Sequence, residues 1–94
     1  MILVWLPRAL QDRDAQIDYL AERNPYAAIE QGDLLDETIA RLPNHPRMGR
    51  QGRVRGTREL VVAGTPFIVI YRERSPAKRV EILRVLHGAQ QWPP

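Results

Sequence analysis

The chain begins with an apolar run, residues 1–6, that is followed at once by Pro7. Apolar residues at successive positions over so short a stretch are typical of a buried strand. Proline lacks an N–H and suits the first turn of a helix, so Pro7 is expected to end the strand and begin a helix. The run is far shorter than a membrane span or the apolar core of a secretory signal.

Two amphipathic helices are predicted next. In residues 7–23, apolar side chains recur at helical spacing with carboxylates among the remaining positions. The Asn24-Pro25 pair ends this helix and starts another, because asparagine is a favoured N-cap and proline suits the first turn. A second apolar stripe then runs to Pro43. The first stripe is Leu10, Ile17, Leu20 and Ala21, and the second is Ala28, Leu35, Ile39 and Leu42. The two helices are expected to form a hairpin.

The second half of the chain predicts strands. Residues 43–57 contain two prolines, three glycines and no hydrophobic period, which predicts a loop that becomes a strand near Val54. Three strand candidates follow, Arg58–Ala63, Pro66–Arg74 and Lys78–Leu86, separated by short turn segments. A three-stranded antiparallel meander is their simplest arrangement.

The middle strand carries the sequence FIVIY at residues 67–71 and is apolar at every position. A half-exposed strand would alternate, so both faces of this one must be covered. The helices can cover one face, and only the tail, residues 87–94, is available for the other. Either the tail folds back, or part of the second face awaits a partner.

Length and composition indicate one α+β domain over residues 1–94. The chain is long enough for one compact core, and 44% hydrophobic with 27% charged residues is typical of a globular protein. We expect an N-terminal strand, a two-helix hairpin and the meander, in a sheet of three or four strands. There is no cysteine, and the two histidines are 42 positions apart. No disulfide, metal site or cofactor is therefore expected, and the predicted location is the cytoplasm, without membrane contact.

The net charge of +3 conceals an asymmetry. Residues 1–42 carry four basic and eight acidic side chains, a net of −4, whereas residues 43–94 carry ten basic and three acidic ones, a net of +7. Thirteen of the fourteen basic residues are arginine, whose planar fork suits phosphate or carboxylate. A GC-rich genome would produce the same ratio, but it would not explain where the arginines cluster.

Five arginines lie between positions 47 and 58: Arg47, Arg50, Arg53, Arg55 and Arg58. The glycines between them allow the backbone to approach a ligand closely. The cluster is either a solvated basic loop or a binding surface for an anionic partner. Its density favours the binding surface.

Four fragments carry a resemblance to a known family: NP.AA at 24–28, P.MGR.GRV.GTREL at 46–60, PFIVIYR at 66–72 and ILRVLHGAQQWP at 82–93. In this order, and on this plan of elements, they resemble the RelE/ParE family of bacterial type II toxins over nearly the whole chain. The resemblance implies a cytoplasmic toxin that arrests growth, as in plasmid stabilization modules, and an antitoxin whose C-terminal segment wraps it. Such segments are often acidic and amphipathic, which would complement a basic, incompletely covered sheet.

The family resemblance leaves two targets open. RelE-like members cut mRNA on the ribosome, and ParE-like members inhibit DNA gyrase. Cleavage through the 2′-hydroxyl needs an acid, a base and cations around the phosphate. The catalytic candidates for that chemistry are His87 as acid or base, Glu59 as the alternative base, and Arg58 and Arg84 on the phosphate, with Arg72 a further phosphate ligand.

Departures from the ribonuclease pattern favour gyrase. Ribonuclease members usually carry an arginine near the start of the central strand, where this chain has Phe67 and Ile68. Their lysine pair and C-terminal tyrosine are also missing. Gyrase inhibition is therefore the first prediction, mRNA cleavage the second, and a non-toxic nucleic-acid-binding module the third. The residues expected to bind the target or the antitoxin are Arg47, Arg50, Arg53, Arg55, Arg58 and Arg72.

Arg84 interrupts the last apolar strand. On a period of two it points with Ile82 and Leu86 and opposite His87, so Arg84 and His87 need not share a site. A carboxylate such as Glu59 or Glu73 is its expected partner, since a desolvated arginine without one is costly.

Overall fold

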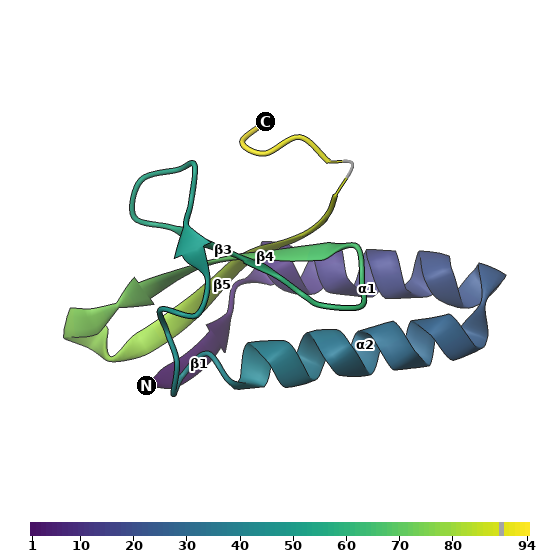
Figure 1. The fold of residues 1–94 in the computed structure, drawn as a ribbon, viewed down its shortest axis with the longest axis horizontal. Helices are drawn as coiled ribbons and strands as arrows, with labels where there is room; N and C mark the ends of the chain where they lie inside the picture. Colours follow the sequence, from purple (N-terminus) through teal and green to yellow (C-terminus); the bar gives the residue numbers. More distant parts are fainter. Residues whose placement is uncertain (89) are drawn as a thin grey trace.

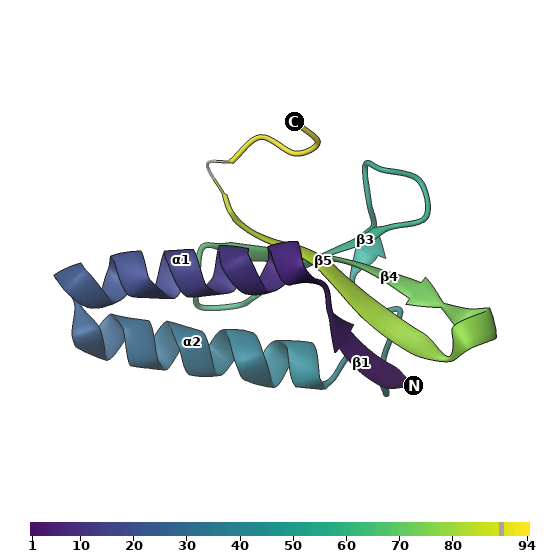
Figure 2. The same cartoon turned by 180° about the vertical axis from the view of Figure 1, so that it is seen from behind.

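The computed structural model describes residues 1–88 and 90–94. In this part of the chain, two long helices pack on one face of a five-stranded sheet, while the C-terminal tail and the loop between β2 and β3 rise from the other face (Figures 1 and 2). The elements in chain order are β1 (Ile2–Trp5), α1 (Pro7–Arg23), α2 (Pro25–Ala40), β2 (Arg50–Gln51), β3 (Arg58–Val61), β4 (Phe67–Arg74), the 3-10 turn η1 (Ser75–Ala77) and β5 (Arg79–His87).

The predicted helical hairpin is confirmed. The Asn24 side chain accepts a hydrogen bond of 3.1 Å from the Ala27 N–H, so the residue that ends α1 also caps α2. Farther along, the Arg13 guanidinium donates to both carboxylate oxygens of Asp36, at 2.8 and 2.6 Å, and ties the two helices together. No helix of the described residues has the length and apolarity needed to cross a membrane.

The sheet has the strand order β1-β5-β4-β3-β2. The antiparallel meander β3-β4-β5 agrees with the prediction, and the α+β class holds. Two details differ. The N-terminal strand β1 joins the meander as a parallel neighbour of β5, and β2 forms at Arg50–Gln51 instead of near Val54. Val54 is held in a turn, because its carbonyl accepts hydrogen bonds from the Thr57 hydroxyl and N–H.

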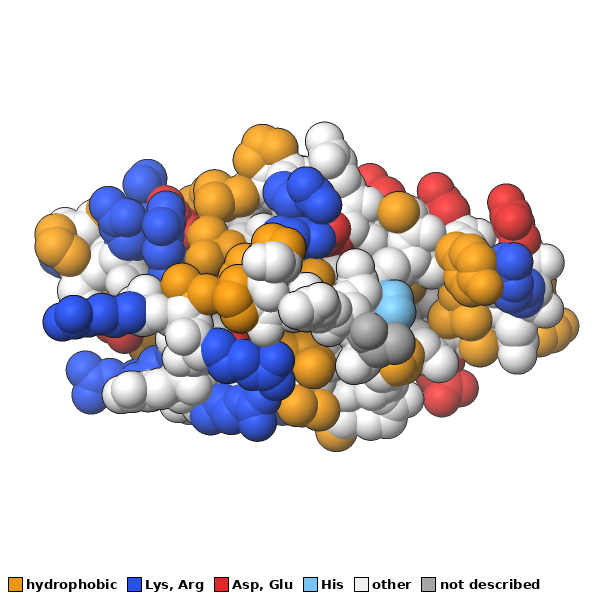
Figure 3. Space-filling model, turned by 90° about the horizontal axis from the view of Figure 1, so that it is seen from above, with side chains coloured by type: hydrophobic (Ala, Val, Ile, Leu, Met, Phe, Trp, Pro, Cys, Tyr) orange, Lys and Arg blue, Asp and Glu red, His pale blue; other side chains and the backbone are white. Residues whose placement is uncertain are grey.

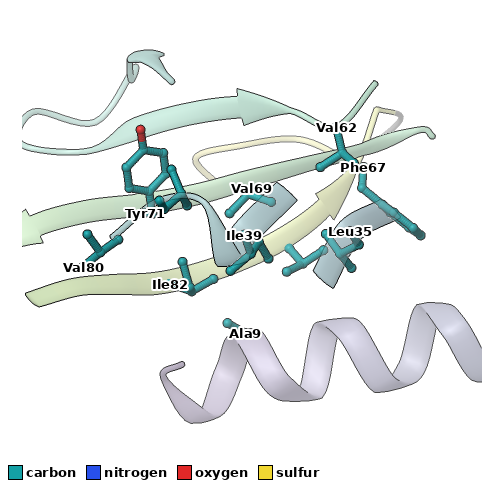
Figure 4. Packing of buried hydrophobic residues seen from close by; sticks show 11 residues of the cluster. Ala9, Leu35, Ile39, Val62, Phe67, Val69, Tyr71, Val80 and Ile82 are labelled. Atoms are coloured by element: carbon teal, nitrogen blue, oxygen red, sulfur yellow. The ribbon is translucent and has the colours of Figure 1, made fainter. Parts of the chain in front are cut away.

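The main core lies between the helices and the sheet (Figure 4). Leu35 and Ile39 of α2 pack toward Val69 and Tyr71 of β4, and all four side chains are fully buried. The expected stripe of α1 was wrong at one position: Ala9 is buried, whereas Leu10 is 44% exposed. The small alanine side chain allows α1 to lie close to the sheet. The remaining core side chains are Leu42, Val62, Phe67, Val80, Ile82 and Val85.

The opposite face of the sheet, called the open face below, is covered only in part. Ile70 is fully buried there, and the tail folds back over the strands. The Trp92 carbonyl accepts a hydrogen bond of 3.0 Å from the Arg53 guanidinium, and the guanidinium carbon of Arg84 lies 5.7 Å from the centroid of the Trp92 ring. Val61 on the same face remains 58% exposed. Both alternatives from the sequence therefore hold in part: the tail folds back, and an apolar portion of the face stays uncovered.

Candidate partner-binding face

Charge is distributed unevenly over the surface that contains the open face. In Figure 3, lysine and arginine side chains gather mostly at one end and at the centre, around exposed apolar groups, while acidic side chains lie toward the end formed by the helices. The charge difference between the two halves of the sequence thus becomes a difference between two ends of the molecule.

Glu59 organises the arginine loop on the open face. Its side chain is buried, and one carboxylate oxygen accepts a hydrogen bond of 2.9 Å from the Arg53 backbone N–H. The other oxygen accepts one of 3.0 Å from the Arg50 guanidinium. The Arg53 backbone hydrogen bond, helped by Arg50 and opposed by burial, holds the pKa of Glu59 below its ordinary value. A buried anion therefore keeps Arg50 and Arg53 together.

Arg58 serves a different purpose on the other side of the sheet. It is aligned with Tyr71, and its guanidinium donates a hydrogen bond of 2.8 Å to the Gly49 carbonyl. The Tyr71 hydroxyl accepts a hydrogen bond from the Gly49 N–H and donates one to the Pro46 carbonyl, each at 2.8 Å. Burial raises the pKa of Tyr71. A Cβ on Gly49 would lie 2.8 Å from the Tyr71 ring, so the close approach requires glycine. Arg58 and Tyr71 anchor the loop.

The remaining loop arginines, Arg47 and Arg55, are exposed. Arg47 borders a shallow hollow with Arg41, His45 and Met48, and Arg55 lies in the turn before β3. The described residues provide neither of them with an ion-pair partner. The five arginines of the sequence cluster thus have different positions. Arg50 and Arg53 lie on the open face, Arg58 anchors the loop, and the other two are exposed to solvent.

Arg72 belongs to a second group on the open face. Its Nε donates a hydrogen bond of 2.6 Å to the Glu81 carboxylate, and the Arg79 Nε lies 2.9 Å from the other oxygen of that carboxylate. The Arg72 hydrogen bond, with the charge of Arg79 beside it, lowers the pKa of Glu81. Neither Glu81 nor Arg79 was among the predicted site residues. A glutamate inside an apolar strand was the signal that could have indicated them.

The expected partners of Arg84 were wrong. Ile70 pairs with Arg84 and Tyr71 with Ile82, so Leu83 is an extra residue in β5 and forms a β-bulge. The bulge reverses the alternation of side chains and places Arg84 on the face opposite Ile82. Its Nε and Nη2 donate to the two carboxylate oxygens of Asp12 in α1, at 2.7 and 3.2 Å. Asp12 also accepts a hydrogen bond from the Val85 N–H.

The four candidates for RNA cleavage do not converge on one point. Glu59 and Arg84 both align with Ile70 on the open face, from strands on either side of it. Arg58 aligns with Tyr71 and His87 with Phe67, both on the face toward the helices. Tyr71 and Phe67 are four residues apart in β4, which separates Arg58 from His87 by roughly 13 Å along the strand. His87 borders a hollow of about 550 Å³ between the strand end and the helices, lined also by Gln16, Tyr19, Gln31, Phe67 and Gln90.

Comparisons with known proteins place the chain among bacterial toxins. A family model described as the ParE toxin of the type II toxin–antitoxin system parDE matches residues 3–92. The putative toxin Y4kP of Sinorhizobium fredii is 39% identical over 89 residues, which cover 95% of this chain and 90% of that protein. Toxin RelE1 of Caulobacter vibrioides is 32% identical over 84 residues and 89% of either chain.

A solved structure agrees with the sequence relatives. The chromosomal ParDE toxin–antitoxin system from P. aeruginosa contains a chain that matches with a TM-score of 0.81 and 28% identity, over 93% of this chain and 95% of that one. The resemblance found in the sequence fragments is confirmed, since model, relatives and structure agree over nearly the full length. The chain therefore belongs to the ParE toxin family of type II toxin–antitoxin systems.

Proposed function

We propose that this type II toxin arrests growth by inhibiting DNA gyrase, and that Arg50 and Arg53 on the open face contact the enzyme. The observation that carries the proposal is that three of the four candidates for RNA cleavage are engaged in structural contacts. Glu59 is buried beneath two arginines, Arg84 is bound to Asp12, and Arg58 holds the Gly49 carbonyl.

Chemistry at these positions supports binding over cleavage. A general base works best with a pKa near the operating pH, whereas the contacts of Glu59 lower its pKa. Arg84 already uses two of its nitrogens on Asp12, so less of its fork is available to a phosphate. A preset group of guanidinium side chains instead suits recognition of an anionic protein surface.

Family membership implies a cognate antitoxin, and we propose that it binds to the open face. An acidic, amphipathic segment would place its carboxylates against Arg50 and Arg53 and its apolar side chains against Val61, which is 58% exposed. Neutralisation then follows because the antitoxin and gyrase compete for one surface.

The test compares the purified toxin in two assays. Gyrase supercoiling should be inhibited by the natural chain, and the Arg50→Ala/Arg53→Ala double variant should need at least about tenfold more protein for the same inhibition. Arg23→Ala, an exposed arginine on α1, is the matched control and should inhibit normally. Codon-phased mRNA cuts on translating ribosomes, with supercoiling unaffected, would refute the gyrase target.

Cleavage of mRNA is the second candidate, favoured by the name of the relative Toxin RelE1 and by the hollow beside His87. If it operates, His87→Ala and Arg58→Ala should abolish the codon-phased cuts. A non-toxic nucleic-acid-binding role is disfavoured by membership of a toxin family. It would regain support if expression of the chain without its antitoxin left growth unchanged.

A further inference from the structure

A second arginine group lies on the open face, apart from Arg50 and Arg53. Across the β4–β5 hairpin, Arg72 is paired with Glu81, and Arg74 with Arg79. These four residues form the hairpin arginine site. The hairpin end lies at one end of the molecule and the helices extend to the other, so the site stands clear of them (Figure 1).

The contacts within the site hold the guanidinium groups of Arg72 and Arg79 beside one buried carboxylate. Glu81 is buried and accepts a hydrogen bond of 2.6 Å from the Arg72 Nε. The Arg79 Nε lies 2.9 Å from the other carboxylate oxygen and forms an ion pair without hydrogen-bond geometry. No described residue accepts a hydrogen bond from the Nη atoms of either arginine. The Nη donors of Arg72 are therefore oriented by a hydrogen bond and those of Arg79 are held beside them by charge, with the two side chains 37% and 43% exposed.

The composition of the site indicates the kind of anion that it takes. Three arginines against one glutamate leave a net charge of +2, and no aromatic side chain lies among them. Protein-binding hot spots are enriched in tryptophan and tyrosine. On this face Trp92 is on another element, and the apolar neighbours of the site, Ile2 beside Arg79 and Val4 beside Glu81, are aliphatic. Charge without stacking groups is typical of contact with a nucleic acid backbone.

We propose that the hairpin arginine site binds phosphate groups of duplex DNA without sequence preference. Arg72 and Arg79 supply the contacts, and Glu81 is the positioning residue that orients them. A duplex major groove admits β-strands, which suits a site carried on a hairpin. The biological setting rests on the proposed function, because the duplex would be the one that gyrase holds.

The test measures binding of the toxin to a fluorescein-labelled duplex of about 20 base pairs, by anisotropy, between roughly 50 and 200 mM KCl. Arg72→Ala and Arg79→Ala should each reduce the slope of log affinity against log salt by about one, and the double variant by about two. Arg23→Ala removes the same charge from the acidic end and should leave the slope unchanged. Unchanged slopes in the Arg72 and Arg79 variants would overturn the proposal.

Glu81→Gln tests the positioning role by its sign. The variant loses one negative charge, so diffuse attraction predicts tighter binding, whereas loss of the carboxylate that holds the two arginines predicts weaker binding. We expect weaker binding, and tighter binding would remove Glu81 from the site. Circular dichroism checks that the variant folds, and the arginine variants decide the proposal if it does not.

The alternative ligand and the gyrase proposal are separable in the same set of variants. A labelled polyglutamate peptide that binds through Arg72 and Arg79, while DNA does not, would identify a protein partner and overturn the DNA site. Supercoiling inhibition without DNA binding would overturn the DNA site and leave the gyrase proposal standing. DNA binding without supercoiling inhibition would overturn the gyrase proposal and leave the DNA site standing.

Discussion

Glu59 and Glu81 are two buried carboxylates. Within the described part of the chain, arginine side chains bind both and a backbone N–H binds Glu59, and this makes the fold sensitive to acid. Their pKa values are lowered from the ordinary 4.5, so below that pH the unfolded chain takes up protons before the folded one. The free energy of unfolding should therefore be nearly constant between about pH 7 and pH 5 and fall as the pH drops through 4. Urea unfolding from pH 7 to pH 3 measures this, and Glu59→Gln should flatten part of the fall.

Tyr71 shows how a core residue can position a surface loop. Tyr71→Phe removes the hydroxyl that accepts from the Gly49 N–H and donates to the Pro46 carbonyl, leaving both groups unpaired. We expect a loss of about 2 kcal/mol in the free energy of unfolding, measured in urea. The pKa of Tyr71 is raised from 10.0, so the natural chain should also lose stability above about pH 10. The variant should lack this alkaline loss, and an equal loss in both chains would argue against the assignment.

At the scale of elements, Asp12 joins the first helix to the last strand. It bonds Arg84 twice and the Val85 N–H once, across 72 and 73 positions of sequence. Asp12→Ala leaves a mostly buried guanidinium without its partner, and we expect a cost of about 3 kcal/mol. Asp14→Ala, two residues away and 68% exposed, should cost less than about 0.5 kcal/mol. Similar denaturation midpoints for the two variants would refute the clamp.

Elements whose signals are local could be predicted from the sequence. The Asn24-Pro25 pair marks both the end of α1 and the start of α2, and turn residues separate the three strands of the meander. The parallel pairing of β1 with β5 could not be predicted, because it joins segments more than 70 positions apart. The bulge before Arg84 has no signal in the residues themselves, and without it the alternation assigns the wrong face.

For the candidate site, too, the sequence indicated the local cluster of residues but not the contacts between strands. Clustering identified the arginine loop, but alternation along β2 and β3 sends Arg50 to the open face and Arg58 to the other, and the short β2 was expected elsewhere. The roles of Glu59 and Glu81 depend on contacts across strands, so neither could be assigned from spacing along the chain.

At the scale of the whole molecule, the open face and the helical surface make different predictions for the antitoxin. Val61→Glu places a like charge where an acidic segment is expected, and it should weaken antitoxin binding by at least about tenfold. Ile29→Glu on α2 is the matched control, since Ile29 is 65% exposed and Val61 58%. Isothermal titration with the purified antitoxin compares them. Equal affinities would show that the antitoxin binds elsewhere.

The helices bury one side of the sheet, while two groups of arginines on the other side are held by the buried carboxylates Glu59 and Glu81. Exchanging an exposed side chain on that outer side leaves the packed interior alone and changes stability by no more than about 0.5 kcal/mol in most cases. The side chains that bind the antitoxin can therefore change in evolution while the fold stays the same. Several related toxin–antitoxin pairs could then coexist in one genome, because each toxin would bind its own antitoxin and not those of the others.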